Sequence, residues 1–299
     1  MSLVFLSYIE EYFLTQINKR EGEVADICRK NRPLMQRLIV SLILFVNLGA
    51  LSAQRESELS VPTEKKFNNA IQLRGGCNLG YFKDINFSPL NYQLSGTALG
   101  LAFAHQSKSD KALLLAQVEY NSNTVKHEIS EAYTADYTIF NLELIYLRKL
   151  NCSKAKLYVG GQYKSNINYL DYDDQSAFSF LIAHSLGISG RGEININQRS
   201  SIGIGMSIPV ISLIGRPPYN GLDKEIEEKK DDLLDLATDG TIESYNRYKA
   251  LDFVVQFKYA LSQRFNLALN YGAYYQKVTT ENRLTQFSNQ ITLGFITKL

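Results

Sequence analysis

The chain has 299 residues, of which 45% are hydrophobic and 21% are charged, and its formal net charge is +2. These values exclude a disordered or collagen-like chain and allow one sizeable domain or two small ones. Because Lys and Arg (32) nearly equal Asp and Glu (30), we expect no nucleic-acid partner. Tyrosine (19) and phenylalanine (15) are plentiful, and this composition favours β-strands.

Residues 35–53 have the layout of a secretory signal peptide. Met35 is followed by Arg37, an apolar run from Leu38 to Leu51, and small residues up to Ala53. The run is shorter than the roughly twenty apolar residues that a membrane-spanning helix needs. We therefore expect a helical signal peptide that is cleaved near Ala53. We further expect residues 1–34 to be an upstream extension that is absent from the mature protein.

Cysteine is scarce after the expected cleavage point. Only Cys77 and Cys152 remain, because Cys28 falls in the extension. No cysteine follows the cleavage region directly, so a lipid anchor at the new N-terminus is not indicated. One cysteine is expected in a strand and the other in a turn, and we expect no disulfide between them.

After a polar linker at residues 54–68, the remainder of the chain (69–299) alternates with period two. One example sets Leu251, Phe253 and Val255 against Asp252 and Gln256. Such alternation predicts strands with one apolar and one polar face. Ten strands are predicted, at residues 69–81, 94–105, 112–125, 135–149, 155–168, 177–191, 201–214, 249–261, 265–279 and 285–299.

These strands are long, and short and long connections alternate between them. Most strands in soluble proteins have about five or six residues. Long strands, short turns at one rim and longer loops at the other predict an antiparallel transmembrane β-barrel with both ends on the short-turn side. A lipocalin-like soluble barrel, apolar inside and polar outside, is the alternative. An aromatic girdle near the strand ends would comprise Tyr81, Tyr120, Tyr146, Tyr163, Tyr259 and Tyr275.

A hairpin from Tyr259 to Leu267 and a last strand from Ile291 to the final residue, Leu299, carry a family resemblance. Together with the signal peptide, they resemble the small outer-membrane β-barrel proteins of Gram-negative bacteria, particularly the Bacteroidetes type. The resemblance implies a location in the outer membrane, contact with outer-membrane lipid, and recognition of the last strand by the barrel-assembly machinery. That family usually ends in Phe, and Leu299 departs from this pattern.

Two known outer-membrane enzyme patterns were compared with the chain. Asp171 and Asp173 resemble the Asp-x-Asp pair of the omptin proteases, but none of the three histidines follows an Asp two positions earlier. His105 and Ser107 match the His-x-Ser spacing of outer-membrane phospholipases and deacylases, which would place base and nucleophile on one strand face. This pair falls at a short turn and has no evident third residue, so a chance match is favoured.

Three acidic residues in one loop, Asp171, Asp173 and Asp174, could supply oxygen ligands to calcium. Charged loop tips are more often simply solvated, and no metal or cofactor is expected.

The polar face of the strands predicts the composition of the lumen. It comprises Gln72, Arg74, Asn78, Gln117, Glu119, Asn141, Glu143, Gln162, Lys164, Asp252, Gln256, Lys258, Asn266, Asn270 and Gln276. Both charge signs are present, and a barrel of about ten strands is only somewhat wider than side chains can fill. We therefore favour a hydrogen-bonded polar plug over a narrow, porin-like pore.

The longest connection, residues 216–248, contains a helical stripe from Asp223 to Ala237 that Gly240 can end. It could lie over the barrel mouth or bind an extracellular partner. The sequence thus predicts a non-enzymatic outer-membrane barrel, structural or surface-interacting, with a pore and a hydrolase using His105 and Ser107 as alternatives.

Overall fold

The computed structural model describes residues 68–86, 88–127, 134–152, 155–171, 178–216, 240–279 and 283–299. The predicted extension, the signal peptide, most of the linker and residues 217–239 lie outside these ranges. Among the described residues, no helix has the length and apolar character needed to cross a membrane. The strands are β1 Asn69–Asp84, β2 Tyr92–Gln106, β3 Ala112–His127, β4 Thr134–Leu150, β5 Lys156–Asp171, β6 Phe178–Asn195, β7 Ser200–Gly215, β8 Thr241–Ser244, β9 Tyr248–Ala260, β10 Phe265–Val278 and β11 Leu284–Lys298.

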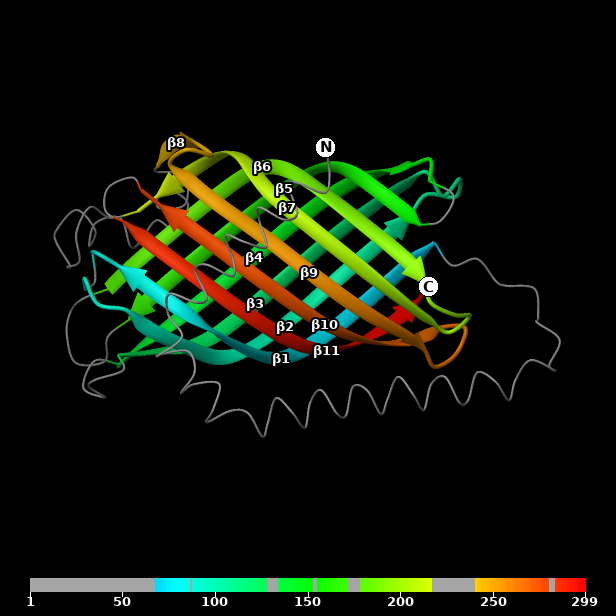
Figure 1. The fold of residues 1–299 in the computed structure, drawn as a ribbon, viewed down its shortest axis with the longest axis horizontal. Coiled ribbons are helices and arrows are strands. Elements are labelled where there is room, and N and C mark those ends of the chain that lie inside the picture. The colour runs from blue at the N-terminus through cyan, green and yellow to red at the C-terminus, as the bar shows by residue number, and fades with distance from the viewer. Residues whose placement is uncertain are drawn as a thin grey trace, which may run out of the picture. The chain divides into compact units, whose positions relative to one another are not determined.

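Ten of these strands form a closed antiparallel barrel (Figure 1). Each pairs with its neighbours in chain order, β7 pairs with β9, and β11 returns to pair with β1. The tenth junction, between β6 and β7, completes the ring. The short β8 pairs only with the end of β7 and stands outside the ring order. The predicted fold and its ten long strands are confirmed, and β8 was not foreseen.

The two rims of the barrel differ. The turn end carries the connections at residues 107–111, 151–155, 196–199 and 261–264. It also carries the start of β1 at Asn69 and the end of β11 at Lys298. The loop end carries the remaining connections, of which 216–240 is the longest.

The outer face of the strands is apolar over most of its height. Among its most exposed side chains are Leu73 (65%), Leu99 (60%) and Ile188 (59%). Two polar residues on this face are each bonded to a tyrosine. Tyr271 Oη lies 2.6 Å from Asn289 Oδ1, and Tyr163 Oη lies 3.1 Å from His184 Nδ1.

The predicted aromatic girdle is only partly correct. Tyr81, Tyr146, Tyr259 and Tyr275 lie near strand ends, but Tyr120 and Tyr163 lie in the middle of β3 and β5. For Tyr163 the contact with His184 explains the position, because the phenol satisfies a polar ring on an apolar face.

The inner face changes character along the strands. In the middle of the barrel it carries the predicted polar residues, such as Asn78, Glu119 and Asn270, all buried. At the loop end it is instead apolar, and the largest buried side chains there are Phe82, Tyr92, Leu94, Tyr137, Leu170, Leu181 and Tyr248. The sequence analysis did not foresee this loop-end cluster.

Candidate functional site in the closed lumen

The inner face of β2 provides a floor of small residues over which neighbouring strands meet. Arg74 of β1 reaches across it, and its Nη2 donates to Glu119 Oε2 of β3 at 2.7 Å. Asn78 Nδ2 similarly donates to Asn123 Oδ1 of β3 at 3.0 Å. Gly100 lies directly beneath the arginine, since a Cβ there would lie 2.5 Å from Arg74 Nε. Side chains two strands apart can therefore bond because β2 places almost no volume between them.

Charged residues in the lumen are paired between strands. Lys164 Nζ of β5 lies 2.6 Å from Asp252 Oδ2 of β9, and Lys258 Nζ of β9 lies 2.7 Å from Glu193 Oε1 of β6. Away from the turn-end edge, where Lys149 and Lys156 also lie, the acids Asp84, Glu119, Glu143, Glu193 and Asp252 match the bases Arg74, Lys164, Arg191, Arg216 and Lys258 in number among the described strands. Such a balanced set neutralises itself, so this part of the lumen presents no excess charge that would select one sign of solute.

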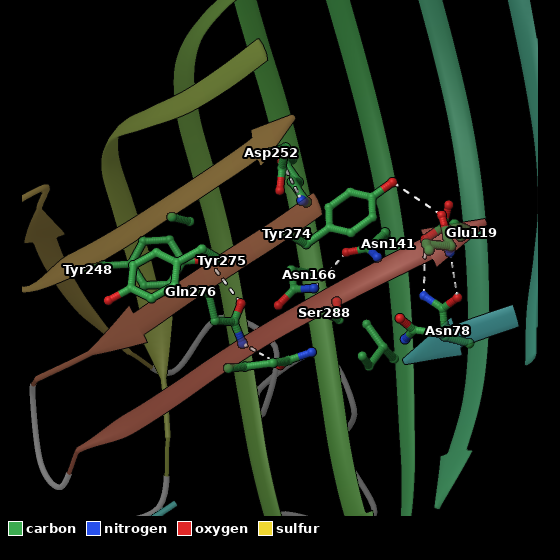
Figure 2. A pocket seen from close by; sticks show the side chains of 16 residues that line it. Asn78, Glu119, Asn141, Asn166, Tyr248, Asp252, Tyr274, Tyr275, Gln276 and Ser288 are labelled. Carbon is green, nitrogen blue, oxygen red and sulfur yellow. Dashed lines mark hydrogen bonds and ion pairs between the residues drawn. The ribbon is translucent and has the colours of Figure 1, made fainter. Parts of the chain in front are cut away.

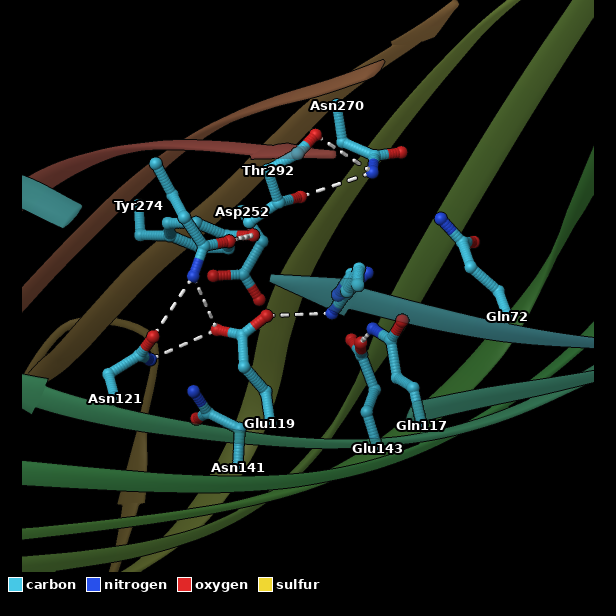
Figure 3. A network of polar contacts seen from close by, with 12 residues as sticks. Gln72, Gln117, Glu119, Asn121, Asn141, Glu143, Asp252, Asn270, Tyr274 and Thr292 are labelled. Atoms are coloured by element: carbon cyan, nitrogen blue, oxygen red, sulfur yellow. Dashed lines mark hydrogen bonds and ion pairs between the residues drawn. The ribbon is translucent and has the colours of Figure 1, made fainter. Parts of the chain in front are cut away.

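Gln290 of β11 extends the network to a strand three positions away from β3 in the ring. Its Nε2 donates to Glu119 Oε1 at 3.1 Å and to Asn121 Oδ1 at 3.0 Å, and its Oε1 accepts from Tyr274 Oη at 3.2 Å. Figure 3 shows Glu119 reached from two sides, with Tyr274 and Asn121 nearby. Because β3 and β11 are separated by β2 and β1, these bonds fasten distant parts of the ring together.

A small polar cavity lies within this network. It offers about 40 Å³ to the centres of water molecules, and Asn78, Asn141, Asn166, Asp252 and Tyr274 are among its lining residues (Figure 2). No described group donates to the buried Oδ1 atoms of Asn78 and Asn166. A cavity of this size holds a few waters, and such waters would satisfy both oxygens. The space is too small for an organic ligand of the usual pocket volume, about 300 Å³ or more.

The loop end of the lumen is closed by apolar side chains around a buried ion pair. Arg216, just after β7, pairs with Asp84 at the end of β1, and both side chains are 1% exposed. Ser179 of β6 donates from Oγ to Asp84 Oδ2 at 3.2 Å, across the full width of the ring. Tyr137 Oη of β4 donates to Gln286 Oε1 of β11 at 2.8 Å. Among the described residues, these contacts span the barrel at this level.

His105 and Ser107 lie close in sequence at the turn end but form separate contacts. The His105 ring is exposed, and its Nδ1 lies 2.7 Å from Asn69 Oδ1. Ser107 Oγ accepts from the backbone amides of Lys111 and Ala112 at 3.1 and 3.0 Å. A serine hydroxyl that caps its own turn in this way has a structural role that needs no catalysis.

Of the three acids considered for calcium, Asp171 is exposed at the end of β5, and Asp173 and Asp174 lie outside the described residues. Among the residues with described positions, no cluster of His, Cys, Asp or Glu is suited to hold a metal ion. Cys77 lies in β1 on the outer face and Cys152 follows β4, as expected.

The sequence analysis missed several residues that close the lumen. Asp84 and Arg216 were assigned to loops, and Gln290 and Tyr274 were not included in the lumen set. Tyr274 could have been found, because it has the same inward facing as Asn270 and Gln276 in β10. Gln290 could also have been found, because period-two alternation continues along β11. The ion pair could not, because it joins chain positions 132 residues apart.

The chain matches no known protein-family model and no curated protein sequence. Solved structures with a similar fold include the outer membrane protease OmpT from Escherichia coli, with 9% identity over 81% of this chain and 99% of that chain, at a TM-score of 0.48. They also include Neisserial surface protein A (11%, covering 77% and 99%, TM-score 0.36) and an outer membrane channel from Pseudomonas putida F1 (10%, covering 81% and 100%, TM-score 0.37).

The architecture itself defines the class of protein. A closed antiparallel barrel with long strands, an apolar outer face and a polar interior is the architecture of Gram-negative outer-membrane β-barrels. Within that class, this chain is a ten-stranded barrel whose described lumen is crossed by bonds between its own side chains.

Proposed function

We propose that this chain is a non-enzymatic outer-membrane β-barrel that serves as a rigid anchor and contacts partners through its loop end. One observation carries the proposal. Side-chain bonds cross the lumen from wall to wall, and the Asp84 to Arg216 pair closes the loop end inside an apolar cluster. A barrel built to pass solutes would have no use for such a closure, whereas a platform for surface loops benefits from its rigidity.

The loop end is proposed to face the cell exterior and the turn end the periplasm, with β11 as the strand recognised during barrel assembly. Long loops on a rigid barrel can vary without disturbing the strand ladder. The 216–248 connection is the largest such element, and its described part, β8, is fastened to β7. We propose it as the site of any partner contact. The Bacteroidetes origin is proposed on the hairpin and terminal-strand pattern alone.

Conductance in planar bilayers tests the proposal. The purified wild-type protein should insert without conductance steps. A variant with Phe82→Gly, Tyr137→Gly and Tyr274→Gly empties the middle and loop end of the lumen and serves as the positive control. Steps from the wild-type protein would instead support the narrow pore, which the polar cavity favours as a second candidate.

The hydrolase alternative has its own assay. Membranes that contain the protein should release no more fatty acid or peptide than membranes that contain Ser107→Ala. An activity that is lost in this variant would contradict the non-enzymatic proposal.

A further inference from the structure

Three lysines form a row at the loop end of four neighbouring strands, β9, β10, β11 and β1, which run side by side in Figure 1. Lys277 is paired in register with Lys249 on one side and with Thr285 on the other, and Thr285 is paired with Lys83. The residues that flank each lysine in sequence are buried in the lumen. The three lysines therefore face outward, and they are called the basic row below.

The basic row has no counter-charge within the described residues. None of its three side chains forms a hydrogen bond or ion pair there, whereas Arg74, Lys164 and Lys258 in the lumen are each paired with an acid. Like charges directly opposite on a sheet repel, as Lys249 and Lys277 do. An arrangement of this kind is stabilised when an anion comes close to the three side chains.

Aromatic residues fix the depth of the basic row. The next outward row toward the turn end pairs Tyr81 with Phe287, Phe287 with Tyr275, and Tyr275 with Leu251. Below it the outer face is mainly apolar, with Leu293 and Leu269 paired at the centre. Tyrosine rings favour the boundary between hydrocarbon and headgroups. The lysines lie two residues beyond that boundary, about 7 Å along the strand, at the level of lipid headgroups.

The strands that follow β1 around the ring, β2, β3 and β4, are different at the same end. The outward residues of β2, β3 and β4 there include Ser95, Thr97, Ser122, Thr124 and Thr138. Their two charges, Lys126 and Asp136, are of opposite sign. The cationic surface thus does not continue onto these three strands, and Arg283 and Arg247, the latter 3.3 Å from Glu243 Oε1, lie in the exposed connections beside it.

We propose that the basic row binds the phosphate group of an anionic lipid in the leaflet that meets the loop end. The acyl chains would lie against the aromatic row, and the lysines would donate to the phosphate oxygens. This inference rests on the proposed location in a membrane. A diester or monoester phosphate fits because it presents several acceptor oxygens to compact ammonium donors.

Lipid binding to the full chain tests the inference. The protein, in a zwitterionic detergent, is titrated with phosphatidylglycerol or with phosphatidylcholine, and bound lipid is counted by native mass spectrometry. The wild-type protein should prefer phosphatidylglycerol by at least about tenfold, since each surface lysine contributes to the attraction. The variant Lys83→Gln, Lys249→Gln, Lys277→Gln should lose this preference, and the corresponding Lys→Arg variant should keep it.

The matched control neutralises three exposed basic residues at the turn end, Lys111→Gln, Arg148→Gln and Arg264→Gln. It changes the net charge equally and should keep the preference. Retained preference in the basic-row variant, equal loss in the control, or displacement of the lipid by millimolar inorganic phosphate would each overturn the inference.

A separate measurement distinguishes this result from a failure of the proposed function. Each variant is inserted into phosphatidylcholine vesicles, and the folded barrel is detected by its altered gel migration before boiling. Failure of the wild-type protein to insert would contradict the membrane location itself. Insertion without a preference for phosphatidylglycerol would contradict only the lipid site.

Discussion

At the scale of single residues, the lumen depends on where volume is absent. Gly100 leaves room for Arg74 to cross β2, and the resulting ion pair with Glu119 is largely shielded from solvent. The arginine and the glycine are 26 positions apart in sequence but face each other in register. Bonding across a strand therefore requires a small residue on that strand as much as it requires the two partners.

Gly100→Ala should destabilise the barrel. The added Cβ would displace Arg74 and weaken its bond to a buried carboxylate, at a cost of about 1–3 kcal/mol. Urea unfolding of the protein in detergent micelles measures the change. Gly75→Ala is the control, because its Cβ points outward and the nearest atom, Leu99 Cδ2, lies 3.4 Å away. Equal effects of both substitutions would show that strand propensity, and not the ion pair, is responsible.

The buried pair at the loop end allows a second test. Asp84→Asn should cost about 3–5 kcal/mol, because it leaves the Arg216 charge buried without a partner. The double variant Asp84→Leu, Arg216→Leu should recover most of that loss, since the surrounding cluster is apolar. Unfolding free energies of the wild-type protein, Asp84→Leu, Arg216→Leu and the double variant form the complete cycle. A double variant less stable than Asp84→Asn would mean that the pair makes contacts beyond those described.

At the scale of elements, the alternation of the strands reverses its phase along their length. In β4 the apolar residues Tyr137 and Ile139 face inward near the loop end, while Phe140, Leu142 and Leu144 face outward nearer the turn end. The outward apolar positions begin where the inward face becomes polar, at Asn141 and Glu143. Closer to the turn end, Ile145 and Leu147 again face inward and are buried, so both faces of the strand are apolar there. The reversal thus marks the edge of the lipid-facing belt.

Depth on the outer face predicts the cost of a charge. Leu269→Arg and Phe257→Arg, which are paired in the central row, should each cost about 2–4 kcal/mol when lipid surrounds them. Thr97→Arg faces outward among the serine and threonine side chains of β2 and β3 and should cost less than about 0.5 kcal/mol. Unfolding in vesicles measures all three. Equal costs would place Thr97 within the lipid as well.

Asn270→Arg, adjacent to Leu269 but facing inward, is unsuitable as a control for the outward arginine variants, because it should also destabilise the barrel. Asn270 accepts from Gln256 at 2.7 Å and donates to Thr292 Oγ1 at 3.1 Å, so the larger side chain has no free space.

At the scale of the whole molecule, the direction of the strands assigns every connection to one rim. The segment between β7 and β8 belongs to the loop end, together with Arg216 and Gly240. Gly240 has a specific role there, because a Cβ at this position would lie 2.6 Å from the carbonyl oxygen of Ile214. The connection therefore returns to the barrel wall at a point where side chains are not tolerated.

An epitope tag inserted within residues 217–239 should be accessible to antibody on intact cells without loss of barrel assembly. The insertion must leave Gly240 unchanged for the steric reason given above. Flow cytometry on intact and on permeabilised cells makes the measurement. Labelling that requires permeabilisation would reverse the proposed orientation of the barrel.

Strand positions and the facing of their side chains could be predicted from the sequence alone, because period-two alternation is a local property of extended backbone. The predicted lumen residues, from Gln72 to Gln276, face inward for that reason. The phase reversal in β2, β3 and β4 was also present in the sequence, but the alternation was taken as uniform along each strand.

The partners within the lumen could be decided only by the tertiary structure. Lys164 meets Asp252 and Asp84 meets Arg216 because ring closure and strand register bring distant walls together. Ring closure and strand register are not local properties of the sequence. Both depend on the number of strands, on their stagger and on which small residues leave space between them. The same holds for the basic row, whose three lysines lie on three strands and become neighbours only once β11 pairs with β1.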